Sequence, residues 1–161
     1  MKHAIIPTDF SIASLQMVHD VMQHYREEEQ VKITLLHLVY IPDSISDLLF
    51  KRRQNRRDIP TEFTQACEII ANKYDSKLVD IKPLIQAGET KAYMENLFDG
   101  LKADTVFIAK DHAWVNPFQD SVQTMALCAK CKVPIVESSV SARAEVKSFS
   151  TIGDLLLVTN D

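Results

Sequence analysis

Glycine is scarce in this sequence. Its 161 residues include three glycines, Gly88, Gly100 and Gly153, which are well separated along the chain. Loops that cradle phosphate groups use glycine, because their backbone must adopt positive φ angles and approach the phosphate oxygens closely. The sequence therefore has no glycine-rich phosphate loop, and we expect no ATP bound in the usual way.

Cysteine is also limited. The three cysteines, Cys67, Cys128 and Cys131, are an odd number without an export signal, which argues against a disulfide framework. Cys128 and Cys131 have CxxC spacing, but they lie late in an expected helix, whereas redox pairs usually lie at a helix N-terminus. Further ligands at zinc-site spacing do not follow. We expect buried structural cysteines and no metal site.

The sequence lacks an excess of positive charge and a long apolar run. A formal net charge of -4 argues against general nucleic-acid binding. The longest apolar runs have the length of strands, well short of the roughly 18 residues that suggest a membrane span. Met1–Phe10 is interrupted by Pro7 and Asp9, which excludes a secretory signal. We expect a cytoplasmic protein without a membrane or nucleic-acid partner.

Strand-like and helix-like segments alternate over residues 1–137. We expect strands at 3–8, 31–39, 78–87, 104–109 and 133–136, with helices at 11–25, 61–74, 91–101 and 118–131. Ser11 and Thr61 are the expected N-caps of the first two helices. This order predicts an α/β fold with a five-stranded parallel sheet and helices on both faces. Pro83 favours an edge or irregular position for the third strand.

Two segments lie outside this alternation. Residues 40–60 are expected to form a loop with about one helical turn, and they contain the basic run Lys51–Arg57. Such a run is typical of a solvated loop, but it could also recognise a phosphate, an acidic partner or a membrane surface. Residues 138–161 form a C-terminal extension: a serine-rich linker, then strand character at 152–159. This last strand either joins the sheet or pairs with a partner chain's edge.

In parallel sheets, ligands bind beyond the carboxyl ends of the strands, near the topological switch point. Here those ends are Thr8–Asp9 and Ala109–His112. Asp9 is either a ligand contact or a turn and cap residue beside Ser11. His37, in an apolar strand, is expected to be a hydrogen-bonded core histidine.

The loop after the fourth expected strand carries the most unusual cluster, Lys110, Asp111, His112 and Trp114. This cluster could bind a small molecule or perform acid–base chemistry. The alternative is a shortened surface loop whose Trp114 packs on the domain or on a partner. Ser121 lacks a surrounding Gly-x-Ser-x-Gly motif, which argues against a hydrolase nucleophile.

Five short segments in this order resemble the universal stress protein family. They are Ile5–Ser11, Leu35–Val39, Gly88, Ala103–Ile108 and Lys132–Val136, and together they span roughly residues 3 to 137. The resemblance implies a Rossmann-like fold of the adenine nucleotide α-hydrolase type.

The resemblance also implies where a nucleotide would lie. In nucleotide-binding members, an aspartate after the first strand and backbone at the end of the second contact the nucleotide, and a Gly-x2-Gly-x9-Gly-Ser/Thr loop holds its phosphates. The positions equivalent to the nucleotide site here are Pro7, Thr8, Asp9, Val39, Ala109, Lys110, His112 and Ser121. The loop positions Ala109, His112 and Asp120 replace all three glycines, and the loop is two residues shorter.

Negative charge at this loop would also repel a bound phosphate group. Asp111 and Asp120 would lie close to it, and one such pair at about 4 Å costs about 4 kcal/mol at an effective dielectric constant of about 20. Lys110 would offset part of this repulsion.

We therefore expect a non-enzymatic stress-response or regulatory protein, a homodimer that binds a partner or a small ligand without a cofactor. One alternative is an adenine-nucleotide binder that holds ATP or AMP through Asp9 and Val39, with phosphates on Lys110 or the basic run. The other is a nucleotide hydrolase that uses the loop with Asp111 and His112.

Overall fold

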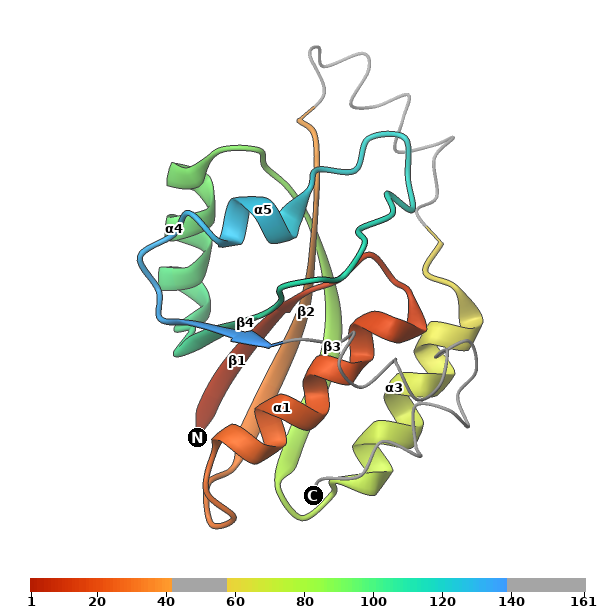
Figure 1. Ribbon diagram of the computed structural model, residues 1–161, viewed down its shortest axis with the longest axis vertical. Coiled ribbons are helices and arrows are strands. Elements are labelled where there is room, and N and C mark those ends of the chain that lie inside the picture. Colours follow the sequence, from red (N-terminus) through yellow and green to blue (C-terminus); the bar gives the residue numbers. More distant parts are fainter. Residues whose placement is uncertain (42–57, 139–161) are drawn as a thin grey trace.

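The computed structural model describes residues 1–41 and 58–138 of the chain. Its strands form one sheet in the order β3-β2-β1-β4-β5, and every neighbouring pair is parallel (Figure 1). The strands are β1 Lys2–Pro7, β2 Val31–Val39, β3 Leu78–Ala87, β4 Thr105–Ala109 and β5 Ile135–Ser138. The predicted α/β fold is confirmed, and β3 with Pro83 lies at an edge. The basic run and the proposed C-terminal strand lie outside the described residues.

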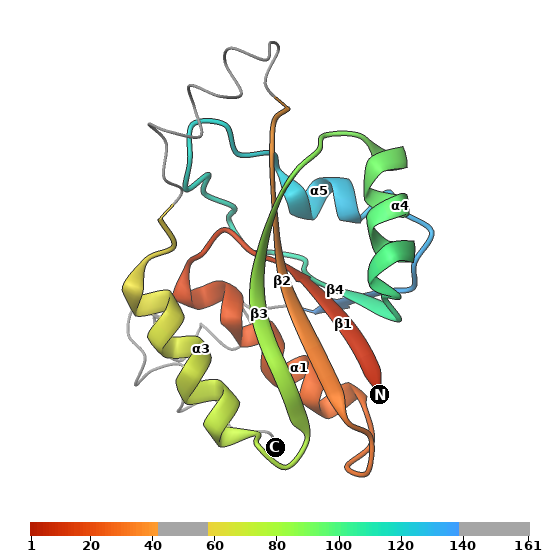
Figure 2. The same cartoon turned by 180° about the vertical axis from the view of Figure 1, so that it is seen from behind.

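Helices cover both faces of the sheet (Figures 1 and 2). The helices are α1 Met17–His24, preceded by the 3-10 helix η1 Ile12–Gln16, then α3 Thr61–Lys73, α4 Lys91–Leu101 and α5 Thr124–Cys128. Helices α1 and α3 lie on one face of the sheet, and helices α4 and α5 lie on the other face. None of the helices in the described residues has the length and apolar character of a membrane span.

The sheet separates two apolar cores because its central strands send alternate side chains to opposite faces. On β2, Ile33 and Leu35 belong to the core under α1 and α3, whereas Leu36 and Leu38 belong to the core under α4 and α5. All four side chains are fully buried. Burial on both faces explains why the sequence of β2 is nearly continuous in apolar residues.

The helix predicted at 118–131 is wrong over its first half, since α5 begins at Thr124. Residues 120–122 instead run antiparallel to the end of β2: the amide of Tyr40 donates to Asp120 O at 2.8 Å, and that of Val122 donates to Leu38 O at 2.8 Å. Backbone groups used in this pairing cannot also form helical hydrogen bonds. Pairing with a strand distant in sequence thus overrides the local helical pattern.

The starts of two helices also differ from prediction. The helix expected from residue 11 begins as η1, whose N-cap Ser11 accepts from the Ser14 amide at 3.3 Å, and becomes α-helical only at Met17. Thr61 is not the cap of α3 but its first residue, because the N-cap is Pro60, which makes no side-chain cap hydrogen bond.

Gly88, between β3 and α4, has no room for a side chain. A Cβ atom there would lie 2.1 Å from Cδ1 of Tyr93, whereas a Cβ at Gly100, on α4, would meet nothing within 4 Å. Gly88→Ala is expected to destabilise the fold by about 1–3 kcal/mol. The matched Gly100→Ala is expected to stabilise it by about 0.5–1 kcal/mol, since alanine is the better helix former.

Urea unfolding of the two variants measures both effects. In a Tyr93→Ala background the cost of Gly88→Ala should largely disappear, because the ring that it meets is gone. Equal stabilities of Gly88→Ala and Gly100→Ala would contradict this packing.

Candidate ligand site at the carboxyl edge of the sheet

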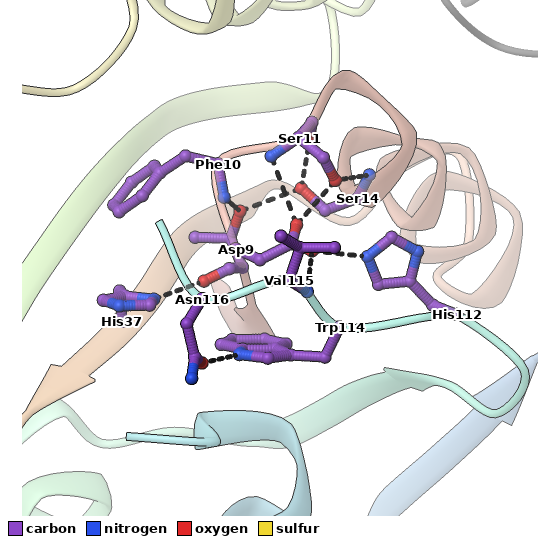
Figure 3. A network of polar contacts seen from close by, with 10 residues as sticks. Asp9, Phe10, Ser11, Ser14, His37, His112, Trp114, Val115 and Asn116 are labelled. Atoms are coloured by element: carbon purple, nitrogen blue, oxygen red, sulfur yellow. Dashed lines mark hydrogen bonds and ion pairs between the residues drawn. The ribbon is translucent and has the colours of Figure 1, made fainter. Parts of the chain in front are cut away.

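The site lies where the strand order changes direction. Chain order leads outward from β1 through β2 to β3 on one side, and from β1 through β4 to β5 on the other. Loops that leave the carboxyl ends of β1 and β4 therefore diverge, and the region between them, called the crevice below, is where doubly wound sheets bind ligands. Figure 3 shows the polar contacts that residues 9–14 and 112–116 make there.

The turn after β1 is fixed by an unusual backbone conformation. Phe10 has a φ angle of 61°, in the left-handed region that costs a residue with a Cβ roughly 1–2 kcal/mol. Its amide donates to Thr8 Oγ1 at 3.0 Å. The Phe10 ring packs edge-on against Phe63 of α3, with ring centroids 5.2 Å apart. Packing and the hydrogen bond hold the turn and point Asp9 into the crevice.

The Asp9 carboxylate accepts four hydrogen bonds from its own chain. Its Oδ1 accepts from Ser11 Oγ at 2.5 Å and from the Ser11 amide at 3.2 Å. Its Oδ2 accepts from His112 Nε2 at 2.9 Å and from the Val115 amide at 3.1 Å. The Asp9 side chain is only 1% exposed. Asp9 thus ties the β1 turn to the loop after β4.

These contacts determine the charge of Asp9. Burial alone would raise the pKa of its carboxyl group, but hydrogen bonds from His112, Ser11 and Val115, with the nearby charge of His112, outweigh burial and lower the pKa to about 2. Asp9 is therefore ionised at all physiological pH values. The charge is compensated inside the protein and is not directed at solvent.

A second chain of hydrogen bonds lies beside Asp9. His37 Nδ1 donates to the Thr8 carbonyl oxygen at 2.7 Å, and its Nε2 is 2.8 Å from Ser121 Oγ. A carbonyl oxygen only accepts, so Nδ1 carries a proton, and the Ser121 hydroxyl is the hydrogen-bond partner of Nε2. Ser121 Oγ accepts in turn from the Phe118 amide at 3.1 Å. His37 is fully buried, as expected for a core histidine.

Trp114 lies over this histidine. The indole and imidazole planes differ by 1°, with ring centroids 5.6 Å apart, which is an offset stack. The indole Nε1 donates to Asn116 Oδ1 at 2.8 Å, a contact within the same loop. Trp114 thus covers the imidazole face on the solvent side of the crevice.

The comparisons with known proteins bear on the fold. The sequence matches no family model and no curated protein. Among solved structures, a universal stress protein family protein from Arabidopsis thaliana with AMP bound aligns with a TM-score of 0.52 at 15% identity, covering 93% of this chain and 98% of that chain. The chain has the universal stress protein fold.

Other solved structures of this family are also similar. Universal stress protein UspA from Lactobacillus plantarum aligns with a TM-score of 0.46 at 11% identity, over 84% of this chain and 96% of that one. A universal stress protein in complex with cAMP aligns with a TM-score of 0.43 at 17% identity, over 86% and 97%.

In this universal stress protein fold, the positions that the resemblance predicts to be equivalent to a nucleotide site lie mostly out of solvent. Pro7, Thr8, Asp9, Val39, Ala109 and Ser121 are all buried. Asp9 contacts His112, and Ser121 pairs with Val39 in an isolated bridge. Lys110 is exposed, and its amide donates to Ser138 O at 2.8 Å. Asp111 is exposed as well.

Several residues that build the site could not be predicted from the sequence. Phe10 adopts its left-handed conformation without being glycine, asparagine or aspartate. Val115 contributes a backbone amide, which any residue except proline could supply. Ser14 donates to Ser11 O at 2.7 Å and lies 2.8 Å from Thr8 Oγ1. Of this network, the expected N-cap Ser11 and the turn residue Asp9 beside it were predicted.

The cysteines are inert in the described structure. All three are free and buried. Burial raises the pKa of the Cys67 thiol to about 12, and it also raises the pKa values of Cys128 and Cys131. Residues 1–41 and 58–138 contain no group of three or more His, Cys, Asp or Glu side chains that could hold a metal ion.

The low pKa of Asp9 predicts a contribution to stability that depends on pH. The group ionises at about 2 in the folded chain and at the ordinary 3.8 when unfolded, so it stabilises the fold by about 2 kcal/mol above pH 4. That stabilisation is lost as the pH falls through 2. Asp9→Asn should therefore cost about 2 kcal/mol at pH 5 and much less at pH 2.

Urea unfolding at both pH values measures the difference. Asp99→Asn, on the exposed side of α4, removes a carboxylate outside the site and is the matched control. A cost of Asp9→Asn that stays the same from pH 5 to pH 2 would show that the charge of Asp9 does not stabilise the fold.

Proposed function

We propose that this chain is a non-enzymatic regulatory protein of the universal stress protein type, which acts by binding a partner or a small ligand without holding ATP in the usual way. The observation that carries the proposal is the saturation of Asp9 by Ser11, His112 and Val115. A nucleotide that used this carboxylate would have to displace donors that the chain itself supplies.

The backbone after β4 supports the proposal. A phosphate-binding loop must point several free amide groups at the anion. Five amides of this segment donate to acceptors within the chain. The His112 amide donates to Ala109 O and the Val115 amide to Asp9 Oδ2. The Phe118 amide donates to Ser121 Oγ, the Ser121 amide to Phe118 O and the Val122 amide to Leu38 O. These five donors are used within the chain, and the segment has no glycine that would let its backbone turn further amides toward phosphate oxygens.

Direct binding tests this proposal. Calorimetry with ATP, ADP and AMP should find no ATP binding tighter than roughly 100 μM, about -5.5 kcal/mol. An affinity that increases from AMP to ATP would mean that the protein binds the phosphate groups, and the proposal that it does not hold ATP in the usual way would be wrong. Asp9→Ala serves as the control, because it should abolish any binding that uses the nucleotide site.

The nucleotide-binding alternative has one specific observation in its favour. The Arabidopsis protein of similar fold was solved with AMP bound, so AMP is the ligand to test first. Under this alternative, Asp9 and Val39 hold the nucleoside part, and Lys110 or the basic run holds the phosphate. The hydrolase alternative has no such observation in its favour, because the 2.9 Å contact of His112 Nε2 with Asp9 is already explained as a tie between the two loops.

The proposal includes a homodimer, and the edge of β5 is the surface that we assign to it. The amides of Val106 and Lys110 donate to Pro134 O and Ser138 O, so these β5 residues turn their polar backbone groups toward β4. By the alternation of a strand, Glu137 directs its amide away from β4, toward the side of β5 where no described strand lies. A strand edge of this kind can pair with a second copy.

Glu137→Pro tests this interface. Proline removes the outward amide but none of the amides directed at β4, so the domain should fold while the dimer dissociates. Sedimentation at micromolar concentration should show a dimer for the wild type and for the control Glu137→Ala, and a monomer for Glu137→Pro. A monomeric wild type would contradict the dimer, and a dimeric Glu137→Pro would exclude the β5 edge.

A further inference from the structure

Residues 111–116, the cover loop, lie across the crevice at the ends of β1 and β4 (Figure 3). Two of its polar groups, His112 Nε2 and the Val115 amide, are directed at the same oxygen atom, Asp9 Oδ2. Its single large side chain, Trp114, is stacked on His37. All three contacts join the loop to groups that line the crevice.

The groups under the cover loop have the chemistry of a small-molecule site. Asp9 is an ionised acceptor with a side chain 1% exposed, and His37 presents one flat face toward Trp114. The rings of Phe10 and Phe118 flank His37, with centroids 5.2 and 5.6 Å from its own. Aromatic walls with one well-placed acceptor recognise a flat ring that carries hydroxyl or N–H donors.

The outer side of the cover loop is exposed to solvent. Val115 is 69% exposed, and Ala113 and Asn116 are exposed too. Segments with few buried apolar contacts open at a lower free energy than the core. Because the Trp114 indole donates to Asn116 inside the loop, this hydrogen bond can move with the loop and need not break.

We propose that the cover loop is an internal plug that competes with a diffusible small ligand for Asp9 and His37. The indole of Trp114 takes the place of the ligand's flat ring, and His112 with the Val115 amide takes the place of its hydroxyl or N–H donors. This inference rests on the proposed function, and it adds how ligand binding is regulated: the apparent affinity is reduced by the fraction of molecules in which the loop is open.

Adenosine is a suitable probe, because it has a bicyclic ring and hydroxyl donors but no phosphate. Trp114→Ala should bind adenosine about tenfold more tightly than the wild type by calorimetry, since the ring that occupies the crevice is gone. Gln119→Ala is the matched control: Gln119 is exposed and lies beyond the cover loop, so the affinity of this variant should equal that of the wild type. A folded Trp114→Ala protein with unchanged affinity would overturn the plug.

A second variant tests the polar contact with Trp114 intact. Trp114 is the only tryptophan of the chain, so its fluorescence reports on the loop alone. In His112→Ala, acrylamide should quench this fluorescence about twice as strongly as in the wild type, because one of the two loop donors to Asp9 is lost. Unchanged quenching would show that Asp9 does not hold the loop, and this result decides the matter if Trp114→Ala fails to fold.

The two proposals fail in different ways. Wild-type affinity that rises with the number of phosphates contradicts the proposed function and leaves the plug intact. Adenosine affinity that does not respond to Trp114→Ala contradicts the plug, whatever the phosphates do.

Discussion

The pairing of Asp9 with His112 and the Val115 amide is the constraint on which the rest of the site depends. It joins the turn after β1 to the loop after β4, two segments about a hundred residues apart in sequence. Charge-assisted hydrogen bonds of this kind contribute about 1.5–3 kcal/mol each, more than neutral ones. With the loop so held, Trp114 lies on His37, and the crevice that the sheet topology creates is filled by the chain itself.

The same fold can thus either bind a ligand at this crevice or fill the crevice with its own side chains. A doubly wound sheet always opens a crevice at its switch point, but the loops decide whether a ligand can use it. Here the loop after β4 carries histidine, tryptophan and valine and contains no glycine. The amides of His112 and Val115 donate to protein acceptors, and the Trp114 indole covers His37. Binding by this protein would therefore depend on loop release as much as on the groups beneath.

Most of the fold could be predicted from the sequence, because the three central strands, β1, β2 and β4, are buried on both faces and the helices alternate with the strands. The predicted bounds of β2 and β3 match the structure, and Pro83 correctly indicated an edge strand. The first half of the helix at 118–131 could not be predicted, because residues 120–122 pair with β2 across about 80 residues. The Asp9 network was equally hidden, since it depends on a backbone amide and on the left-handed Phe10.

Amide hydrogen exchange at Val115 tests the central claim most directly. The Val115 side chain is 69% exposed, so burial of that side chain would not slow exchange of its amide. If the amide donates to Asp9 Oδ2 as the structure has it, exchange should be at least about tenfold slower than in an unstructured peptide. Exchange at the rate of an unstructured peptide would mean that the loop does not hold Asp9, and the account of a self-occupied site would be wrong.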